Sequence, residues 1–158
     1  MIFLGIDPGT RRIGYGVVDA TGGDMRFIDA GILKITAEED VPALEEAKRG
    51  VDRLIKKYRP HAVAVEKVFF AKNQKTAIAV AQARGVVLLA AKECGATIKE
   101  YTPNEVKLGV TGDGSADKKA VLKMVRLVLN KHDLKVIDDA SDALALAILC
   151  SGDRAARG

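Results

Sequence analysis

Several residue types that mark particular protein classes are scarce in this sequence. Cysteine occurs only twice, at Cys94 and Cys150, without a Cys-x-x-Cys pair or a neighbouring pair of histidines. This scarcity argues against a disulfide framework and a zinc site, and we expect both thiols to be reduced and buried. The 15 glycines and 4 prolines lie near background frequency, which argues against collagen-like, disordered and low-complexity chains.

Long apolar runs are also missing. The longest, around residues 86–91, is far shorter than the roughly 20 residues that a membrane-spanning helix requires. The first residues carry no basic leader and reach a carboxylate at Asp7, so they do not resemble a signal peptide. We therefore expect a cytoplasmic protein with no membrane contact.

The residues that are present suffice for one folded domain. The chain has 158 residues, 48% of them hydrophobic, which fits a single core of ordinary size. We expect this domain to span residues 1–150, followed by a short basic tail over 151–158. Lysine and arginine outnumber aspartate and glutamate by 25 to 21, and this excess favours an anionic partner.

Apolar periodicity predicts a mixed α/β fold. Short apolar runs closed by turns indicate three antiparallel strands near the start of the chain, and later strands alternate with helices. This order indicates a mixed five-stranded sheet flanked by helices. The predicted strands are 2–6, 14–18, 25–34, 62–66 and 96–101; the predicted helices are 42–58, 73–94, one that begins at the N-cap Ser115, and 139–150, with a turn near 103–108 and a glycine-rich loop over 109–114.

Acidic residues stand at the ends of three of these elements. Asp7 closes the first strand, Glu66 closes the fourth, and Asp139 and Asp142 open the last helix on one side of it. If these elements are neighbours, four carboxylates converge and require cations, and oxygen ligands favour Mg²⁺ or Mn²⁺. Two such ions can promote phosphoryl displacement. Each acid alone also fits a helix cap or a solvated surface group, so the spacing leaves convergence open.

Basic residues surround two of these positions. The loop after Glu66 interleaves Phe69 with lysines such as Lys72, followed by Asn73, a pattern that suits phosphate neutralisation and base stacking. Core packing of the phenylalanines is the alternative. A second basic group includes Lys107 and Lys118, and backbone N–H groups at the Ser115 helix start could bind a phosphate there. A solvated helix face is the alternative for neighbouring lysines.

Four motifs stand in order over nearly the whole chain: Gly5-Ile6-Asp7-Pro8-Gly9-Thr10 with Gly14-Tyr15-Gly16, Glu66-Lys67-Val68-Phe69, Gln82-Ala83-Arg84-Gly85-Val86, and Asp139-Ala140-Ser141-Asp142-Ala143-Leu144-Ala145. Together they resemble the RuvC family of bacterial Holliday junction resolvases. The resemblance implies an RNase H-like fold of the retroviral integrase superfamily and a homodimer that nicks two strands of a four-way DNA junction symmetrically.

The same resemblance implies roles for single residues. The four acids would bind two divalent metal ions, Phe69 would stack on a base near the crossover, and Lys107 and Lys118 would contact phosphate near the scissile bond. It also implies preferential cutting within a short T-rich consensus and cooperation with the branch-migration complex RuvAB. Asp138 adjoins Asp139, which leaves the register of that ligand open, and the family's longer basic C-terminal tail is absent.

The leading hypothesis is a metal-dependent endodeoxyribonuclease of DNA recombination and repair. Lys118 would assist the water nucleophile, and cleavage would leave 5′-phosphate and 3′-hydroxyl ends. A YqgF-type nuclease acting on RNA shares the first-strand pattern but lacks support from the Phe69 loop. An actin-like or sugar-kinase phosphotransferase would need a second related domain. A non-catalytic DNA-binding module would be weakened by surplus carboxylates.

Overall fold

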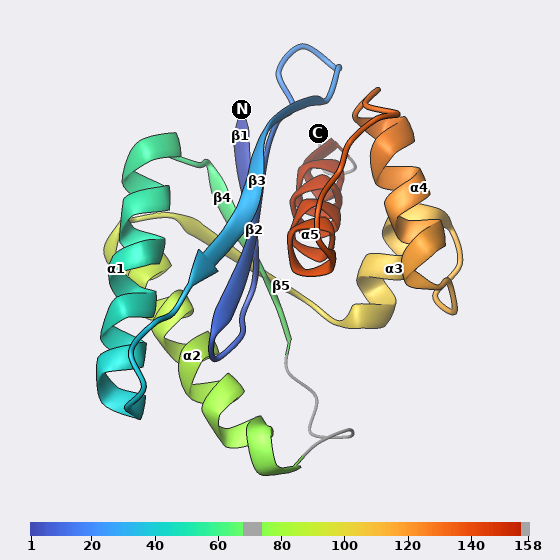
Figure 1. The fold of residues 1–158 in the computed structure, drawn as a ribbon. Helices are drawn as coiled ribbons and strands as arrows, with labels where there is room; N and C mark the ends of the chain where they lie inside the picture. The colour runs from blue at the N-terminus through green and yellow to red at the C-terminus, as the bar shows by residue number, and fades with distance from the viewer. Residues whose placement is uncertain (68–73, 156–158) are drawn as a thin grey trace.

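The computed structural model describes residues 1–67 and 74–155 (Figure 1). Phe69, Lys72 and Asn73 lie outside the described residues. Within the described ranges no helix is both long and apolar enough to cross a membrane. The elements are β1 (Ile2–Asp7), β2 (Arg12–Asp19), β3 (Arg26–Lys34), α1 (Asp40–Tyr58), β4 (Ala62–Glu66), α2 (Gln74–Glu93), β5 (Thr97–Tyr101), α3 (Pro103–Thr111), α4 (Lys118–Val128) and α5 (Asp138–Ala155).

The five strands form one mixed sheet in the order β3-β2-β1-β4-β5. β1, β2 and β3 pair antiparallel as successive neighbours, and β4 and β5 then add in parallel on the other side of β1. This confirms the predicted sheet. Because β1 and β4 run parallel and adjacent, with Ile6 opposite Val65, the carboxyl ends of both strands meet at the same edge.

Helices cover both faces of the sheet. Figure 1 shows α1 and α2 on one face and α5 on the other, with α3 and α4 beyond α5. Side chains alternate between the faces, as a strand requires: Leu4 and Ile6 belong to the core beneath α1 and α2, whereas Phe3 belongs to the core shared with α5. Asp7 and Glu66 stand in the rows that face α5.

Glycine allows α5 to lie directly on the strands. A Cβ atom on Gly5 would lie 1.8 Å from the carbonyl oxygen of Ala143, and one on Gly14 would lie 2.1 Å from the carbonyl oxygen of Asp139. Any larger residue at these positions would force the helix and sheet apart. The glycines of the first motif therefore determine how closely the start of α5 approaches the ends of the strands.

Several local predictions are wrong. Residues 103–111 form a helix rather than a turn, because Pro103 starts it and Thr102 forms a reciprocal capping box with Glu105, so Gly109 is helical and not part of a loop. Asp117, not Ser115, caps α4 by accepting a hydrogen bond from the Ala120 N–H.

The remaining differences concern exposure and helix length. α5 continues to Ala155, so the first five residues of the expected tail are helical. Cys94 is exposed, although Cys150 is buried as predicted, and both thiols are free. On α2, Ile78 and Leu89 are exposed, so that side of the helix is not buried within the subunit. A helix uniform in small apolar residues does not reveal in its sequence which side faces the core.

Candidate active site

The carboxylates of Asp7 and Glu66 are placed by adjacent parallel strands. Ile6 and Val65 are partners in the ladder, and each acid closes its own strand at the carboxyl edge of the sheet. Arg84 of α2 donates from Nε to the main-chain oxygen of Glu66 at 3.3 Å and pairs with Glu100 of β5. These contacts hold the end of β4 between α2 and β5.

The first turn of α5 brings two further carboxylates to the same edge. Asp139 and Asp142 lie at its amino end, and the close approach at Gly14 sets the depth of that end against β2. The charges of Asp139, Asp142 and Glu66 all act on Asp7. The structure therefore places the four acids at one edge of the sheet, within electrostatic range of Asp7.

This arrangement disfavours the ionised form of Asp7. Burial, followed by the negative charges of Glu66, Asp142 and Asp139, raises the pKa of Asp7 to about 8 from an ordinary value of 3.8. Burial together with the Asp142 charge also raises the pKa of Glu66, opposed by Lys118 and Lys107. Carboxylates held this way in a metal-free protein favour a bound cation.

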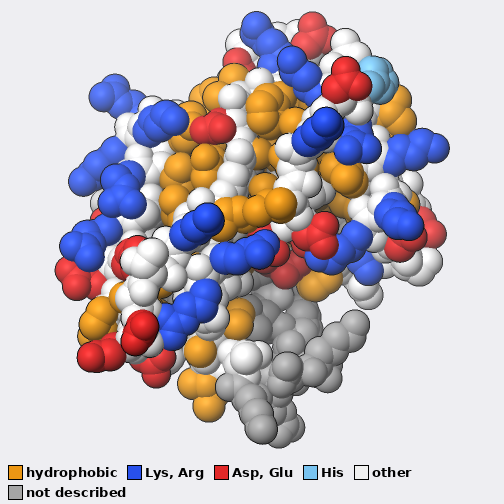
Figure 2. Space-filling model, viewed as in Figure 1, with side chains coloured by type: hydrophobic (Ala, Val, Ile, Leu, Met, Phe, Trp, Pro, Cys, Tyr) orange, Lys and Arg blue, Asp and Glu red, His pale blue; other side chains and the backbone are white. Residues whose placement is uncertain are grey.

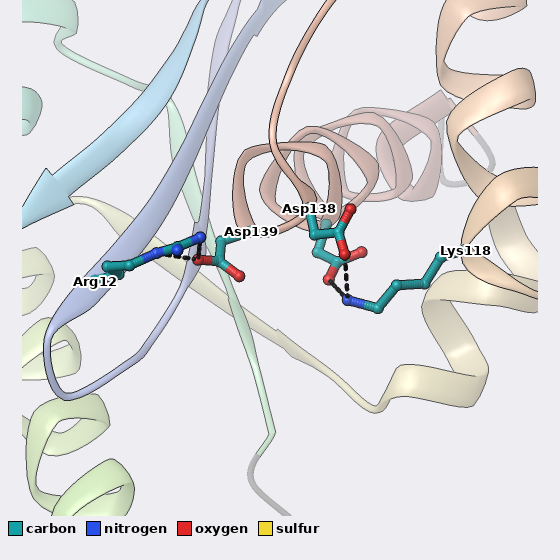
Figure 3. A network of polar contacts seen from close by, with 5 residues as sticks. Arg12, Lys118, Asp138 and Asp139 are labelled. Atoms are coloured by element: carbon teal, nitrogen blue, oxygen red, sulfur yellow. Dashed lines mark hydrogen bonds and ion pairs between the residues drawn. The ribbon is translucent and has the colours of Figure 1, made fainter.

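Two basic side chains already contact the acids of α5 (Figure 3). Arg12, at the start of β2, donates from Nε and Nη2 to Oδ2 of Asp139 at 3.0 and 2.7 Å. Lys118, the first residue of α4, donates from Nζ to Oδ2 of Asp142 at 3.1 Å and lies 3.7 Å from Asp138. Burial would lower the Lys118 pKa, but its bond to Asp142 and the surrounding acids outweigh burial and raise that pKa.

Asp138 and Asp139 differ in their surroundings. Asp139 is 30% exposed, acts on Asp7 and is held by Arg12. Asp138 is 75% exposed and contacts only the amine of Lys118 among the ion pairs of the described residues. Asp139 is therefore the residue that joins the acidic group.

The donor chemistry of the site fits a hard divalent cation. Four carboxylates supply only oxygen, the ligand type that Mg²⁺ and Mn²⁺ prefer. Burial and an excess of nearby negative charge raise the pKa of Asp7. Among the described residues no group of three or more acidic, histidine or cysteine side chains is already drawn together at metal-binding distance. The ion pairs with Arg12 and Lys118 are consistent with this more open arrangement, because each draws an acid of α5 toward a basic side chain.

The remaining predicted residues lie around this edge at different depths. Lys107 of α3 is half-buried and its charge reaches Glu66. Ser115 lies in the loop before α4, where its N–H and hydroxyl groups donate to Asp113 at 2.8 and 2.7 Å, so its donors are already occupied. Figure 2 shows acidic side chains gathered near the centre of this face, with lysines and arginines on both sides of them.

Arg12 was not among the predicted site residues. Its signal in the sequence was its place on the strand: it precedes Gly14 and Gly16 by two and four residues, so it shares the face on which α5 lies. Arg84 was noticed only as part of a motif. Its contact with Glu66 depends on the packing of α2 against β4, which the sequence did not specify.

A larger side chain at Gly14 should displace the acids of α5. We expect Gly14→Ala to destabilise the fold by about 1–3 kcal/mol, as overpacking commonly does, because the new Cβ would meet the Asp139 backbone. Chemical denaturation measures this loss. Gly152→Ala is the matched control: Gly152 lies in α5 with open space around its Cβ position, so this variant should be as stable as the parent or about 0.5–1 kcal/mol more stable.

The family model and the curated proteins that match this chain agree in their description. The family model described as crossover junction endodeoxyribonuclease RuvC matches residues 3–150. The crossover junction endodeoxyribonuclease RuvC of Natranaerobius thermophilus is 45% identical over 149 residues, which cover 94% of this chain and 92% of that protein. The protein of the same name from Rubrobacter xylanophilus is 47% identical over 148 residues, covering 93% and 83%.

Solved structures agree with these relatives. The structure of Thermus thermophilus RuvC in complex with a Holliday junction substrate matches with a TM-score of 0.89 at 33% identity, covering 99% of this chain and 96% of that one. The structure of the same Thermus protein described without the junction gives a TM-score of 0.88. These matches confirm the RNase H-like arrangement of the mixed sheet and its helices.

Proposed function

The chain belongs to the RuvC family of crossover junction endodeoxyribonucleases, and from this premise we propose that it resolves Holliday junctions by nicking two strands at its acidic edge. The observation that carries the proposal is the position of Asp7, on which the charges of Glu66, Asp142 and Asp139 all act, with the charge of Asp142 acting on Glu66 as well. Such a group suits hydrolysis of a phosphodiester, in which negative charge must be stabilised on the attacking and leaving oxygens.

Divalent cations would be held by these four carboxylates. Two Mg²⁺ ions, or Mn²⁺ as a substitute, would supply Lewis-acid stabilisation and activation of water. The chain's own residues provide the rest: Asp7 and Glu66 offer partly buried oxygens, and the sheet edge fixes them relative to α5. The Lys118 amine, bonded to Asp142, is placed to assist proton transfer or to meet a phosphate oxygen.

Contacts to DNA are assigned to the basic side chains beside this edge. Lys107 and Lys118 would neutralise phosphates near the scissile bond, since both carry charge that reaches Glu66. Phe69, with Lys72 and Asn73, is proposed to meet a base and the backbone near the crossover. Ser115 would make a weaker DNA contact, because Asp113 already accepts hydrogen bonds from the N–H and the hydroxyl of Ser115.

A homodimer is proposed because two symmetric cuts require two sites related by a twofold axis. α2 offers a surface for it. Ile78, Gly85 and Leu89 recur on one side of this helix, where Ile78 and Leu89 are 68% and 52% exposed and Gly85 has open space around it. Exposed apolar side chains beside a glycine suit close packing against a second α2.

Disrupting this surface should separate the subunits. We expect Leu89→Glu to convert a species of about 34 kDa, twice the 16.8 kDa chain, into the monomer, because a charge would be buried between two helices. Light scattering coupled to size-exclusion chromatography measures the mass. Leu127→Glu, equally exposed on α4, is the control and should leave the mass unchanged. A wild-type monomer, or equal behaviour of both variants, would contradict this assignment.

Cooperation with the RuvAB branch-migration complex and a cytoplasmic location complete the proposal. Both agree with a DNA junction as substrate. The nuclease unit would comprise residues 1–150, followed by the short basic tail over 151–158, of which residues 151–155 continue α5.

A cleavage assay on matched substrates tests the proposed function. Purified protein is incubated with a mobile four-way junction, linear duplex DNA of the same sequence and an RNA–DNA hybrid, with and without Mg²⁺. Paired symmetric nicks in the junction alone, only with Mg²⁺, are expected. Preferential cutting of the hybrid would instead favour the RNA-directed alternative.

A further inference from the structure

We propose that Arg12 is a positioning residue for Asp139, holding one carboxylate oxygen so that the other is presented to a divalent cation. This inference rests on the proposed function, since it concerns the same acidic edge. It adds a residue that the sequence motifs did not single out and that reaches the site from the start of β2.

The geometry of the contact is specific. Both Nε and Nη2 of Arg12 donate to the same atom, Oδ2 of Asp139, at 3.0 and 2.7 Å. Among the described residues no hydrogen bond is recorded to Oδ1 of Asp139, so that oxygen keeps its capacity to accept. Figure 3 shows Arg12 on one side of the Asp139 carboxylate, and Asp138 and Lys118 on the other side.

The fold fixes where Arg12 can reach. Arg12, Gly14 and Gly16 alternate along β2 and share the face beneath α5. A Cβ atom at Gly14 or Gly16 would meet α5 backbone at 2.1 or 2.6 Å, so this face presses directly on the helix. Arg12 is the first residue of this row. Unlike Gly14 and Gly16 it carries a side chain, and this side chain reaches the first turn of α5.

A hydrogen-bonded partner behind a metal-binding carboxylate normally strengthens metal binding. Such partners orient the ligand, and their loss typically weakens metal affinity or activity by about 10–100-fold. If Arg12 acted only through its positive charge, it would weaken metal binding, because a positive side chain repels a divalent cation. The sign of the change on removing Arg12 therefore separates positioning from simple electrostatics.

The neighbouring residue provides a matched control. Arg11 is also exposed, but its guanidinium donates to the main-chain oxygens of Ala37 and Glu38. Arg11→Gln and Arg12→Gln therefore remove the same charge from adjacent positions, and only the second removes a contact with Asp139.

Calorimetric titration with Mn²⁺ alone, without DNA, tests the proposal. Arg12→Gln should bind Mn²⁺ at least about tenfold more weakly than wild type, and Arg12→Lys, which keeps the charge but not the paired contact, should also bind more weakly. Arg11→Gln should stay within about twofold of wild type, as expected for an exposed charge that touches none of the acids. In cleavage, Arg12→Gln should need more Mg²⁺ for half-maximal rate and recover most of its kcat at saturation.

Equal or tighter Mn²⁺ binding by Arg12→Gln would overturn the proposal, and so would an equal loss in Arg11→Gln. Arg12→Lys keeps the test decisive should Arg12→Gln fail to fold, because unchanged Mn²⁺ affinity in Arg12→Lys would also overturn it. Failure of the proposed function would look different: the wild-type protein itself would not cut a four-way junction.

Discussion

Asp7→Asn is expected to lower the rate of junction cleavage by roughly three orders of magnitude or more, because one ligand of the proposed metal site is lost and metal ions contribute several kcal/mol to transition-state stabilisation. Asp7 lies at the centre of the acidic group, where Glu66, Asp142 and Asp139 all act on it.

Binding of the junction should survive this change. The basic residues beside the site are untouched, and removing a negative charge does not weaken phosphate contacts. Single-turnover cleavage and an electrophoretic mobility assay without metal measure the two quantities on the same protein. Cleavage at the normal rate would show that Asp7 is not a metal ligand, and a parallel loss of binding would indicate misfolding.

The second large effect concerns stability rather than cleavage. The folded protein holds a proton on Asp7 up to a pKa of about 8, whereas the unfolded chain releases it near 3.8. The folded state therefore binds more protons between these values, and the free energy of unfolding of the metal-free protein falls as pH rises through this window. Above about pH 8 the contribution of this group levels off.

Asp7→Asn should remove that dependence. Asparagine resembles the protonated acid in size and carries no charge, so the stability of the variant relative to wild type should increase between pH 5 and pH 8, by an upper limit of about 4 kcal/mol. Urea denaturation in the presence of a chelator, at both pH values, measures the difference. A stability difference that is the same at both pH values would show that the acids are not crowded as described.

These two effects have one physical origin. A group of carboxylates that is unfavourable in the metal-free protein becomes favourable when cations bind, so stability is lost at the site that performs the chemistry. The Arg12 and Lys118 contacts reduce this repulsion without removing it, since the pKa of Asp7 remains raised even though Lys118 acts to lower it.

Strand-end acids were predictable from the sequence because local patterns determine them. Asp7 and Glu66 each follow an apolar run, and parallel neighbours must align their carboxyl ends. The approach of Asp139 and Asp142 was not predictable from spacing alone. It depends on α5 lying on β1 and β2 at backbone contact, which Gly5 and Gly14 permit but do not by themselves reveal.

The errors arose where two local solutions competed. Ser115 and Asp117 are both good helix caps, and the choice went to Asp117 because Asp113 accepts from the N–H and hydroxyl of Ser115. The sequence of α2 is ambiguous in the same way, because Ile78 and Leu89 suit a contact between subunits as well as packing in a core. The structure exposes both. The contact of Arg12 with Asp139 spans 127 residues of sequence, a separation at which no periodicity argument applies.

Anomalous diffraction from a crystal soaked in manganese tests the shared cation site most directly. The account predicts anomalous peaks at the carboxyl edge of the sheet, bound by oxygens of Asp7 and Glu66 together with acids from the first turn of α5. Peaks confined to other surfaces, or an occupied site that leaves Asp7 uncoordinated, would contradict it.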